Sequence, residues 1–276
     1  EVTVARFSDA HFYVMCAAFS EQKVTDWFNQ HIEAGEDVSI DIVSEAIGCL
    51  VLSGPRSRDV MSAITDTELN NENWPWLRAK LINVAGIDGV RALRMSYQGE
   101  LGWELHAPIK AMSQVYDALW AVGEPHGIAN FGSYALNSMR LEKGFKGASE
   151  LTNEVTLPEA DVMRFCKLDK EWFIGRNATM DSADGALRWI CAYLEIDANG
   201  VDAHTSETVF HKGKRVGQVS SGGFGFTTNK SLAFAYIAPE CSAPGTKLEV
   251  MIMAERRPAK VIVDAVYDPK NLLPRQ

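Results

Sequence analysis

The spacing of apolar residues changes character near residue 185. Before that point, runs with helical spacing alternate with short runs typical of strands, and 111–122 carries apolar residues at the three- and four-residue steps of an amphipathic helix. After it, only short strand-like runs follow, at 188–196, 207–211, 214–220, 231–237, 246–253 and 259–266. Turns rich in glycine and polar residues separate these runs, and Ser221-Gly222-Gly223 is expected to be one of them. The pattern predicts an α+β domain over 1–184 and a small all-β barrel or sandwich over 185–276.

The sequence of residues 1–184 predicts strands and helices in mixed order. Strands are expected at 2–7, 11–17, 38–43, 48–53, 77–84, 89–97 and 101–107, and helices after Ser20 and at 56–64, 111–122 and 132–145. The opening β-β-α-β-β-α order favours an α+β domain over the strict βαβ repetition of a dinucleotide-binding unit. A chain of 276 residues is also too long for one simple core.

Charge and composition exclude several classes of binding partner. The chain has 27 basic and 36 acidic residues and a net charge of −9, so no basic face for nucleic acid is expected. No apolar run reaches the ~18 residues of a membrane span. Phosphate-binding loops, nucleophile elbows and zinc-protease motifs are absent from the sequence. The expected partner is therefore a small molecule, with no nucleic acid and no membrane.

The cysteines and histidines give no ligand-like spacing. The five cysteines form no CxxC pair and mostly lie in apolar runs, which indicates buried reduced thiols and a cytoplasmic protein. The six histidines are interpreted as surface or half-buried imidazoles. The chain lacks an initiator Met and opens within an expected strand, so we expect it to be a piece of a longer polypeptide.

The most informative segment is Ser96-Tyr97-Gln98-Gly99-Glu100-Leu101-Gly102-Trp103-Glu104. A tight turn between Glu100 and Leu101 would place Tyr97 directly opposite Glu104, with Cβ atoms ~5 Å apart. A carboxylate can accept two parallel N–H bonds from a planar fork, such as the 2-amino-4-oxo edge of a pterin or a guanine. The alternative is an exposed Tyr–Glu pair in an ordinary hairpin.

A second segment, 130–144, begins a helix at Gly132-Ser133 and carries Arg140 and Glu142. These two side chains lie two residues apart and therefore point to different faces of the helix. Arg140 is a candidate for holding a ligand carboxylate. The alternative, which we favour from the residues alone, is a buried structural ion pair.

Four ordered motifs resemble one known family. They are Y-x-G-E-L-G-W-E-L from Tyr97, N-F-G-x-Y-A-x-N-x-x-R-L-E-K from Asn130, F-I-G-R from Phe173 and K-S-L-A-F-A-Y from Lys230. Together they resemble the aminomethyltransferase (glycine-cleavage T-protein) family, over essentially the whole chain. The L-G-W-E, N-F-G and R-L-E-K forms most resemble the folate-binding C-terminal half of dimethylglycine and sarcosine dehydrogenases.

The resemblance implies a cloverleaf of α+β subdomains closed by a C-terminal six-stranded β-barrel. It implies transfer of the methylene unit from an N-methyl amine, dimethylglycine or sarcosine, to tetrahydrofolate, which gives 5,10-methylenetetrahydrofolate. An FAD-binding amine dehydrogenase domain is expected in cis, in the amino-terminal half of the parent protein. By the same resemblance Tyr97 and Glu104 hold the folate, and Arg140 is carried as a third folate-binding candidate.

The sequence departs from the family pattern at informative places. Glu1 stands where the family has an Asp beside the folate reaction centre, and it is the catalytic candidate. Leu136 stands where glycine-cleavage T-proteins have a folate-contacting Arg, which favours the demethylating branch. The opening part of the family's fold has no counterpart here. Two alternatives stay open, an aminomethyltransferase of the glycine cleavage system and a non-catalytic folate-binding module.

Overall fold

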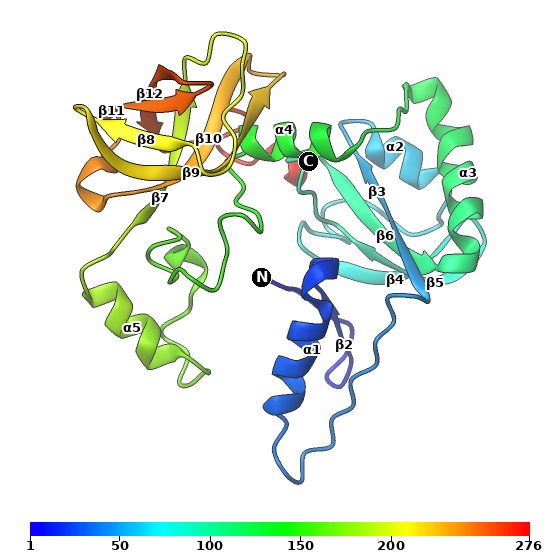
Figure 1. The fold of residues 1–276 in the computed structure, drawn as a ribbon. Coiled ribbons are helices and arrows are strands. Elements are labelled where there is room, and N and C mark those ends of the chain that lie inside the picture. The colour runs from blue at the N-terminus through cyan, green and yellow to red at the C-terminus, as the bar shows by residue number, and fades with distance from the viewer. The chain divides into compact units, whose positions relative to one another are not determined.

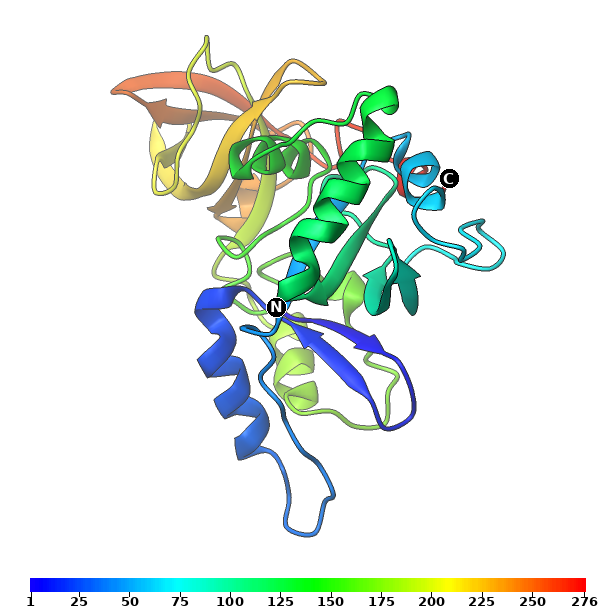
Figure 2. The same cartoon turned by 90° about the vertical axis from the view of Figure 1, so that its right-hand side faces the viewer.

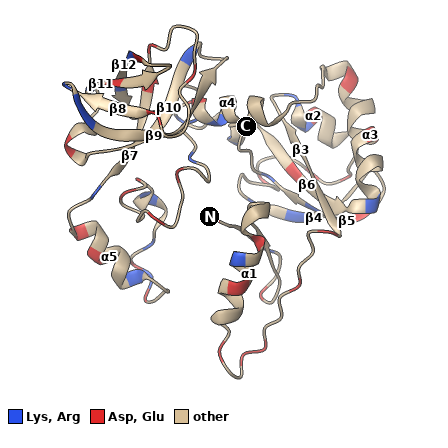
Figure 3. Ribbon diagram, in the orientation of Figure 1, with Lys and Arg blue, Asp and Glu red and all other residues tan.

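The computed structural model describes residues 1–276 and divides into two compact units. The first comprises Glu1–Phe131 with Lys270–Gln276, and the second comprises Gly132–Pro269 (Figure 1). The predicted domain division after residue 184 stays a prediction. No helix combines the length and the apolar character that crossing a bilayer requires. Lys and Arg positions are interspersed with Asp and Glu positions in each unit (Figure 3).

The first unit contains two sheets and three α-helices. Its elements are β1 (Thr3–Arg6), β2 (Phe12–Met15), α1 (Glu21–Gln30), β3 (Ile47–Ser53), α2 (Ser57–Ser62), β4 (Ala79–Val84), β5 (Ile87–Leu93), β6 (Gly102–Pro108) and α3 (Met112–Gly123), with 3₁₀ turns at Ala18–Ser20, Ile109–Ala111, Glu124–His126 and Leu273–Arg275. β1 and β2 form an antiparallel ribbon, while the four-stranded antiparallel sheet has the order β3-β6-β5-β4.

The core of the first unit lies between this four-stranded sheet and α2 and α3. Figure 2 shows α3 lying along the sheet. Alternate residues of β6 point into the core, so Trp103, Leu105 and Ala107 are fully buried, together with Trp74 from a loop. The other face of β6 is therefore left to its polar residues, and this face carries the candidate site.

The strand predicted at 38–43 is wrong. These residues are irregular, β3 begins only at Ile47, and Val38, Ile40 and Ile42 are all exposed. Alternating apolar residues make a strand only where a neighbouring strand offers backbone partners, and no strand pairs with this segment. Ser20 does precede α1, but its side chain makes no capping hydrogen bond.

The second unit is built on a closed barrel. Its elements are α4 (Ser133–Glu142), α5 (Arg176–Asp184), β7 (Ile190–Ile196), β8 (Thr208–His211), β9 (Lys214–Gly225), β10 (Lys230–Ile237), β11 (Lys247–Ile252) and β12 (Glu255–Ile262), with 3₁₀ turns at Met163–Phe165 and Pro239–Cys241. The six strands close in the order β10-β7-β12-β11-β8-β9. The predicted α+β class and six-stranded barrel are confirmed, and the sandwich alternative is excluded.

Helix α4 packs on the outside of the barrel. On β10, Ala233 and Ala235 face the barrel interior while Leu232 and Phe234 form a second cluster with Leu141 of α4. Ser221-Gly222-Gly223 is not the predicted turn, because it lies inside β9. A Cβ on Gly225 of the same strand would come within 2.6 Å of the Glu142 side chain, so glycine allows α4 to approach β9 closely.

Candidate functional site

Two polar side chains share the face of β6 that points away from the core. Glu104 and His106 are two residues apart on the strand, so they lie on the same side of the sheet. The His106 Nε2 atom is 3.5 Å from Glu104 Oε2. His106 is buried, whereas the Glu104 side chain keeps 22% of its surface exposed. This half-open carboxylate is the group on β6 that a ligand can reach.

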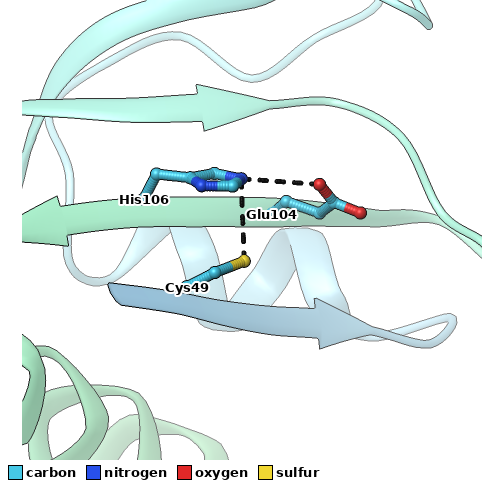
Figure 4. Close-up of side chains that lie close together, drawn as sticks. All are labelled: Cys49, Glu104 and His106. Carbon is cyan, nitrogen blue, oxygen red and sulfur yellow. Dashed lines mark hydrogen bonds and ion pairs between the residues drawn. The ribbon is translucent and has the colours of Figure 1, made fainter. Parts of the chain in front are cut away.

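Neighbouring strands bring two further side chains to His106. Cys49 of β3 is directly opposite His106 in the sheet, and its Sγ lies 3.6 Å from His106 Nε2. The Tyr13 hydroxyl of β2 lies 3.2 Å from His106 Nδ1, and the two rings meet edge to face. Figure 4 shows that the Cys49 sulfur and the Glu104 carboxylate both approach the same nitrogen of the imidazole. We call Cys49, Glu104 and His106 the β6 cluster.

Burial and charge set the protonation of the groups around this cluster. Burial of the thiol, together with the Glu104 carboxylate, raises the pKa of Cys49 to about 12 although the residue has an exposed surface. Cys49 is therefore protonated at neutral pH and is a poor nucleophile. Burial also raises the pKa of Tyr13, against an opposing effect of Arg91, whose guanidinium lies over the Tyr13 ring.

The structure does not form the predicted Tyr97–Glu104 cross-strand pair. Strand β5 ends at Leu93, and it is Leu93 that lies opposite Glu104. Tyr97 is half-buried in the bend that joins β5 to β6. Beyond this pair the chain leaves β6, and Arg94 is buried, where it donates to backbone oxygens of Trp74 and of the tail residue Gln276.

The other candidates lie elsewhere in the fold. Glu1 is exposed and precedes β1, and no hydrogen bond or ion pair joins it to the β6 cluster. Arg140 belongs to α4 in the second unit, where it is buried. It donates to Asn137, to the carbonyl of Phe145 and to the carboxylate of Glu150 at 3.1 Å. Most of its donors are thus used inside the unit. The folate-binding role of Arg140 and the catalytic role of Glu1 stay predictions.

The sequence interpretation missed Tyr13, Cys49 and His106. The sequence predicts a surface or half-buried imidazole for His106 and a buried thiol for Cys49, whereas His106 is buried and Cys49 is exposed. One local signal was available, because Glu104 and His106 stand at the i, i+2 spacing that places two strand residues on one face. Cys49 and Tyr13 reach the cluster only through strand pairing and ribbon packing between distant segments, which their local sequence does not reveal.

Two family profiles match the chain. The profile of the GCVT N-terminal domain matches residues 1–170, and that of the glycine cleavage T-protein C-terminal barrel domain matches residues 191–268. The chain belongs to the glycine-cleavage T-protein (aminomethyltransferase) family. The resemblance expected from the four motifs is therefore confirmed.

Among its relatives, this T-protein family member is 34% identical to mitochondrial dimethylglycine dehydrogenase of Mus musculus over 95% of the chain and 30% of that protein. It is 37% identical to mitochondrial sarcosine dehydrogenase of Mus musculus over 83% of the chain and 26% of that protein. The chain thus spans less than a third of the length of these relatives.

The fold is shared with a solved T-protein. The glycine cleavage system aminomethyltransferase T from Bartonella henselae superposes with a TM-score of 0.83 at 19% identity, over 97% of the chain and 72% of that structure. This likeness establishes the T-protein fold with its α+β part and its barrel. Our chain is an aminomethyltransferase-like domain related to dimethylglycine and sarcosine dehydrogenases.

Proposed function

We propose that the chain binds a reduced folate through Glu104 and serves as the one-carbon acceptor domain of an N-methyl amine dehydrogenase. The one-carbon unit would come from oxidative demethylation of dimethylglycine or sarcosine, and the product would be 5,10-methylenetetrahydrofolate. The relatedness to dimethylglycine and sarcosine dehydrogenases supports the choice of amine. An FAD-binding domain in cis and a cytoplasmic location are parts of the same proposal.

The Glu104 carboxylate is the observation that carries this proposal. It is part-buried on a sheet face, and its one hydrogen-bonding neighbour, His106, engages Oε2 alone at 3.5 Å. Oε1 therefore remains available, and Oε2 is held only weakly. A pterin presents an amino group and a ring N–H side by side, which matches the two oxygens of a carboxylate. The residues present thus fit a reduced pterin.

The surroundings of Glu104 also suit ligand orientation. β3 and β5 flank β6 on either side, with Val51 and Leu93 paired to Glu104, so the backbone beneath the carboxylate is fixed. Tetrahydrofolate supplies the nucleophilic amine that accepts the one-carbon unit. A carboxylate held in place would orient that amine and replace a bimolecular encounter by a preorganised one. Tyr97 is proposed to assist binding, and Glu1 to supply the acidic group near the reacting amine.

A binding titration tests this proposal. The chain is titrated calorimetrically with 5-formyltetrahydrofolate, a stable reduced folate, alongside Glu104→Gln and the matched control Glu124→Gln, whose exposed carboxylate lies outside the site. Loss of a charge-assisted hydrogen bond costs about 1.5–3 kcal/mol, so Glu104→Gln is expected to weaken binding ~10- to 100-fold. The control is expected to bind like the unmodified chain. Equal affinity of all three proteins would refute the role of Glu104.

A further inference from the structure

We propose that the β6 cluster is a binding site for a divalent transition-metal ion, with Zn²⁺ as the best match. Cys49 offers a sulfur, His106 a ring nitrogen and Glu104 a carboxylate oxygen, and these ligand atoms all lie within 4.8 Å of one another. Thiolate, imidazole and carboxylate are the three ligand types that zinc takes in proteins. Calcium and magnesium prefer all-oxygen sites, so this set of ligands selects against them.

The distances between the ligand atoms match a tetrahedral ion. Typical Zn–S, Zn–N and Zn–O bond lengths give about 3.5 Å between sulfur and nitrogen and about 3.3 Å between nitrogen and oxygen at a tetrahedral centre. The observed separations are 3.6 Å from Cys49 Sγ to His106 Nε2 and 3.5 Å from His106 Nε2 to Glu104 Oε2. The third separation, from Cys49 Sγ to the Glu104 carboxylate oxygen, lies within 4.8 Å, and a rotation of the half-exposed Glu104 side chain would bring it to the about 3.6 Å of a tetrahedral centre.

Tyr13 supports the site from behind the imidazole. Its hydroxyl is 3.2 Å from His106 Nδ1, the ring nitrogen that faces away from the cluster. When the tyrosine oxygen accepts this hydrogen bond, the imidazole proton resides on Nδ1 and the lone pair of Nε2 points to the ion. Metal-binding histidines in proteins almost always have such a partner on their second nitrogen.

Three protein ligands leave one position of a tetrahedral ion for water or another small ligand. Cys49 and Glu104 keep exposed surface, so an ion can reach the cluster from solvent. Binding of the ion displaces the Cys49 proton to solvent, and the resulting thiolate and the Glu104 carboxylate together balance a dication. Arg91 of β5, paired with His106, adds one positive charge to this face. Occupation would engage Glu104, so metal and pterin would compete for the same carboxylate.

Cobalt substitution tests the proposal directly. Co²⁺ accepts the same ligands and, when bound by a thiolate, shows a sulfur-to-metal charge-transfer absorption in the near ultraviolet. The folded chain is titrated with Co²⁺ and then with Zn²⁺ as competitor, next to Cys49→Ser, Cys49→Ala and the control Cys16→Ser, a half-buried cysteine of the same unit. Circular dichroism verifies the folding of each variant.

The expected result is a charge-transfer band that saturates at one Co²⁺ per chain. Addition of Zn²⁺ should abolish this band. The band should persist in Cys16→Ser and vanish in both Cys49 variants, with Zn²⁺ affinity lowered at least ~100-fold, the upper end of what loss of an outer-sphere partner alone costs. Absence of the band in the unmodified chain, or its persistence in the Cys49 variants, would overturn the proposal. None of these measurements involves folate, so they stand apart from the proposed function.

Discussion

Replacing Glu150 by alanine should strongly destabilise the second unit. The Glu150 side chain is fully buried, and four groups converge on its carboxylate. Oε2 accepts from Arg140 Nη1 at 3.1 Å and from the Gly147 amide at 2.8 Å, while Oε1 accepts from the Ser220 and Ser221 hydroxyls at 2.7 and 2.6 Å. The network connects α4 to strand β9, so it holds the helix against the barrel.

Removing the carboxylate leaves Arg140 as a buried guanidinium without its counter-ion. Breaking a buried ion pair on one side costs about 3–5 kcal/mol. The unfolding equilibrium constant of this unit should therefore rise between about a hundredfold and several thousandfold. The two serine hydroxyls and the Gly147 amide lose their acceptor as well, which favours the upper half of that range.

Hydrogen exchange in increasing urea is the appropriate assay, because it reports the opening free energy of the barrel peptides separately from the first unit. The matched control is Glu249→Ala on β11, whose partner Arg256 lies at 3.4 Å with both side chains 40% exposed. An exposed pair of this kind contributes at most about 1 kcal/mol. If Glu150→Ala destabilises the barrel no more than this control does, the ion-pair reasoning is wrong.

Three further predictions concern packing, pH and metal. Gly222→Ala should lower the unfolding free energy by about 1–3 kcal/mol, since the added Cβ would collide with the carbonyl oxygen of Ala203. Gly132→Ala has open space and should lose only the preference for glycine over alanine at the N-cap of α4, so it should cost less; equal urea midpoints of the two variants would contradict this. Hydrogen bonds from Arg188 lower the pKa of Glu159 from 4.5 to about 2, so its stabilising contribution is complete above pH 4.5 and is lost as the pH falls towards 2. Glu159→Gln should therefore be less stable than the unmodified chain at neutral pH, with a gap that closes in acid; a gap independent of pH in urea titrations would refute the assignment. Zn²⁺ should weaken 5-formyltetrahydrofolate binding to the unmodified chain but not to Cys49→Ser, and equal weakening of both would exclude competition at Glu104.

A strand could be predicted from the sequence where apolar and polar side chains alternate and a neighbouring strand is present to pair with it. In β6, Trp103 and Leu105 alternate with Glu104 and His106, so both the strand and its polar face follow from the sequence. The barrel was predicted for the same reason, from short strands separated by turns. At 38–43 the alternation was equally clear, yet no strand lies beside this segment to pair with it.

The site was only partly predictable because its partners come from distant parts of the chain. Tyr97 was placed opposite Glu104 on the assumption of a regular hairpin. The structure instead ends β5 at Leu93, and the next residue, Arg94, is held by backbone oxygens that include one of the tail residue Gln276, far along the chain. Local sequence cannot report such a contact.

The central claim is that a reduced folate binds at the β6 face through Glu104. Hydrogen–deuterium exchange with and without saturating 5-formyltetrahydrofolate tests it most directly. The account predicts slowed exchange in β6 and in the bend around Tyr97, and loss of this protection in Glu104→Gln at the same ligand concentration. Protection confined to the barrel, or unchanged protection of β6 in the variant, would contradict it.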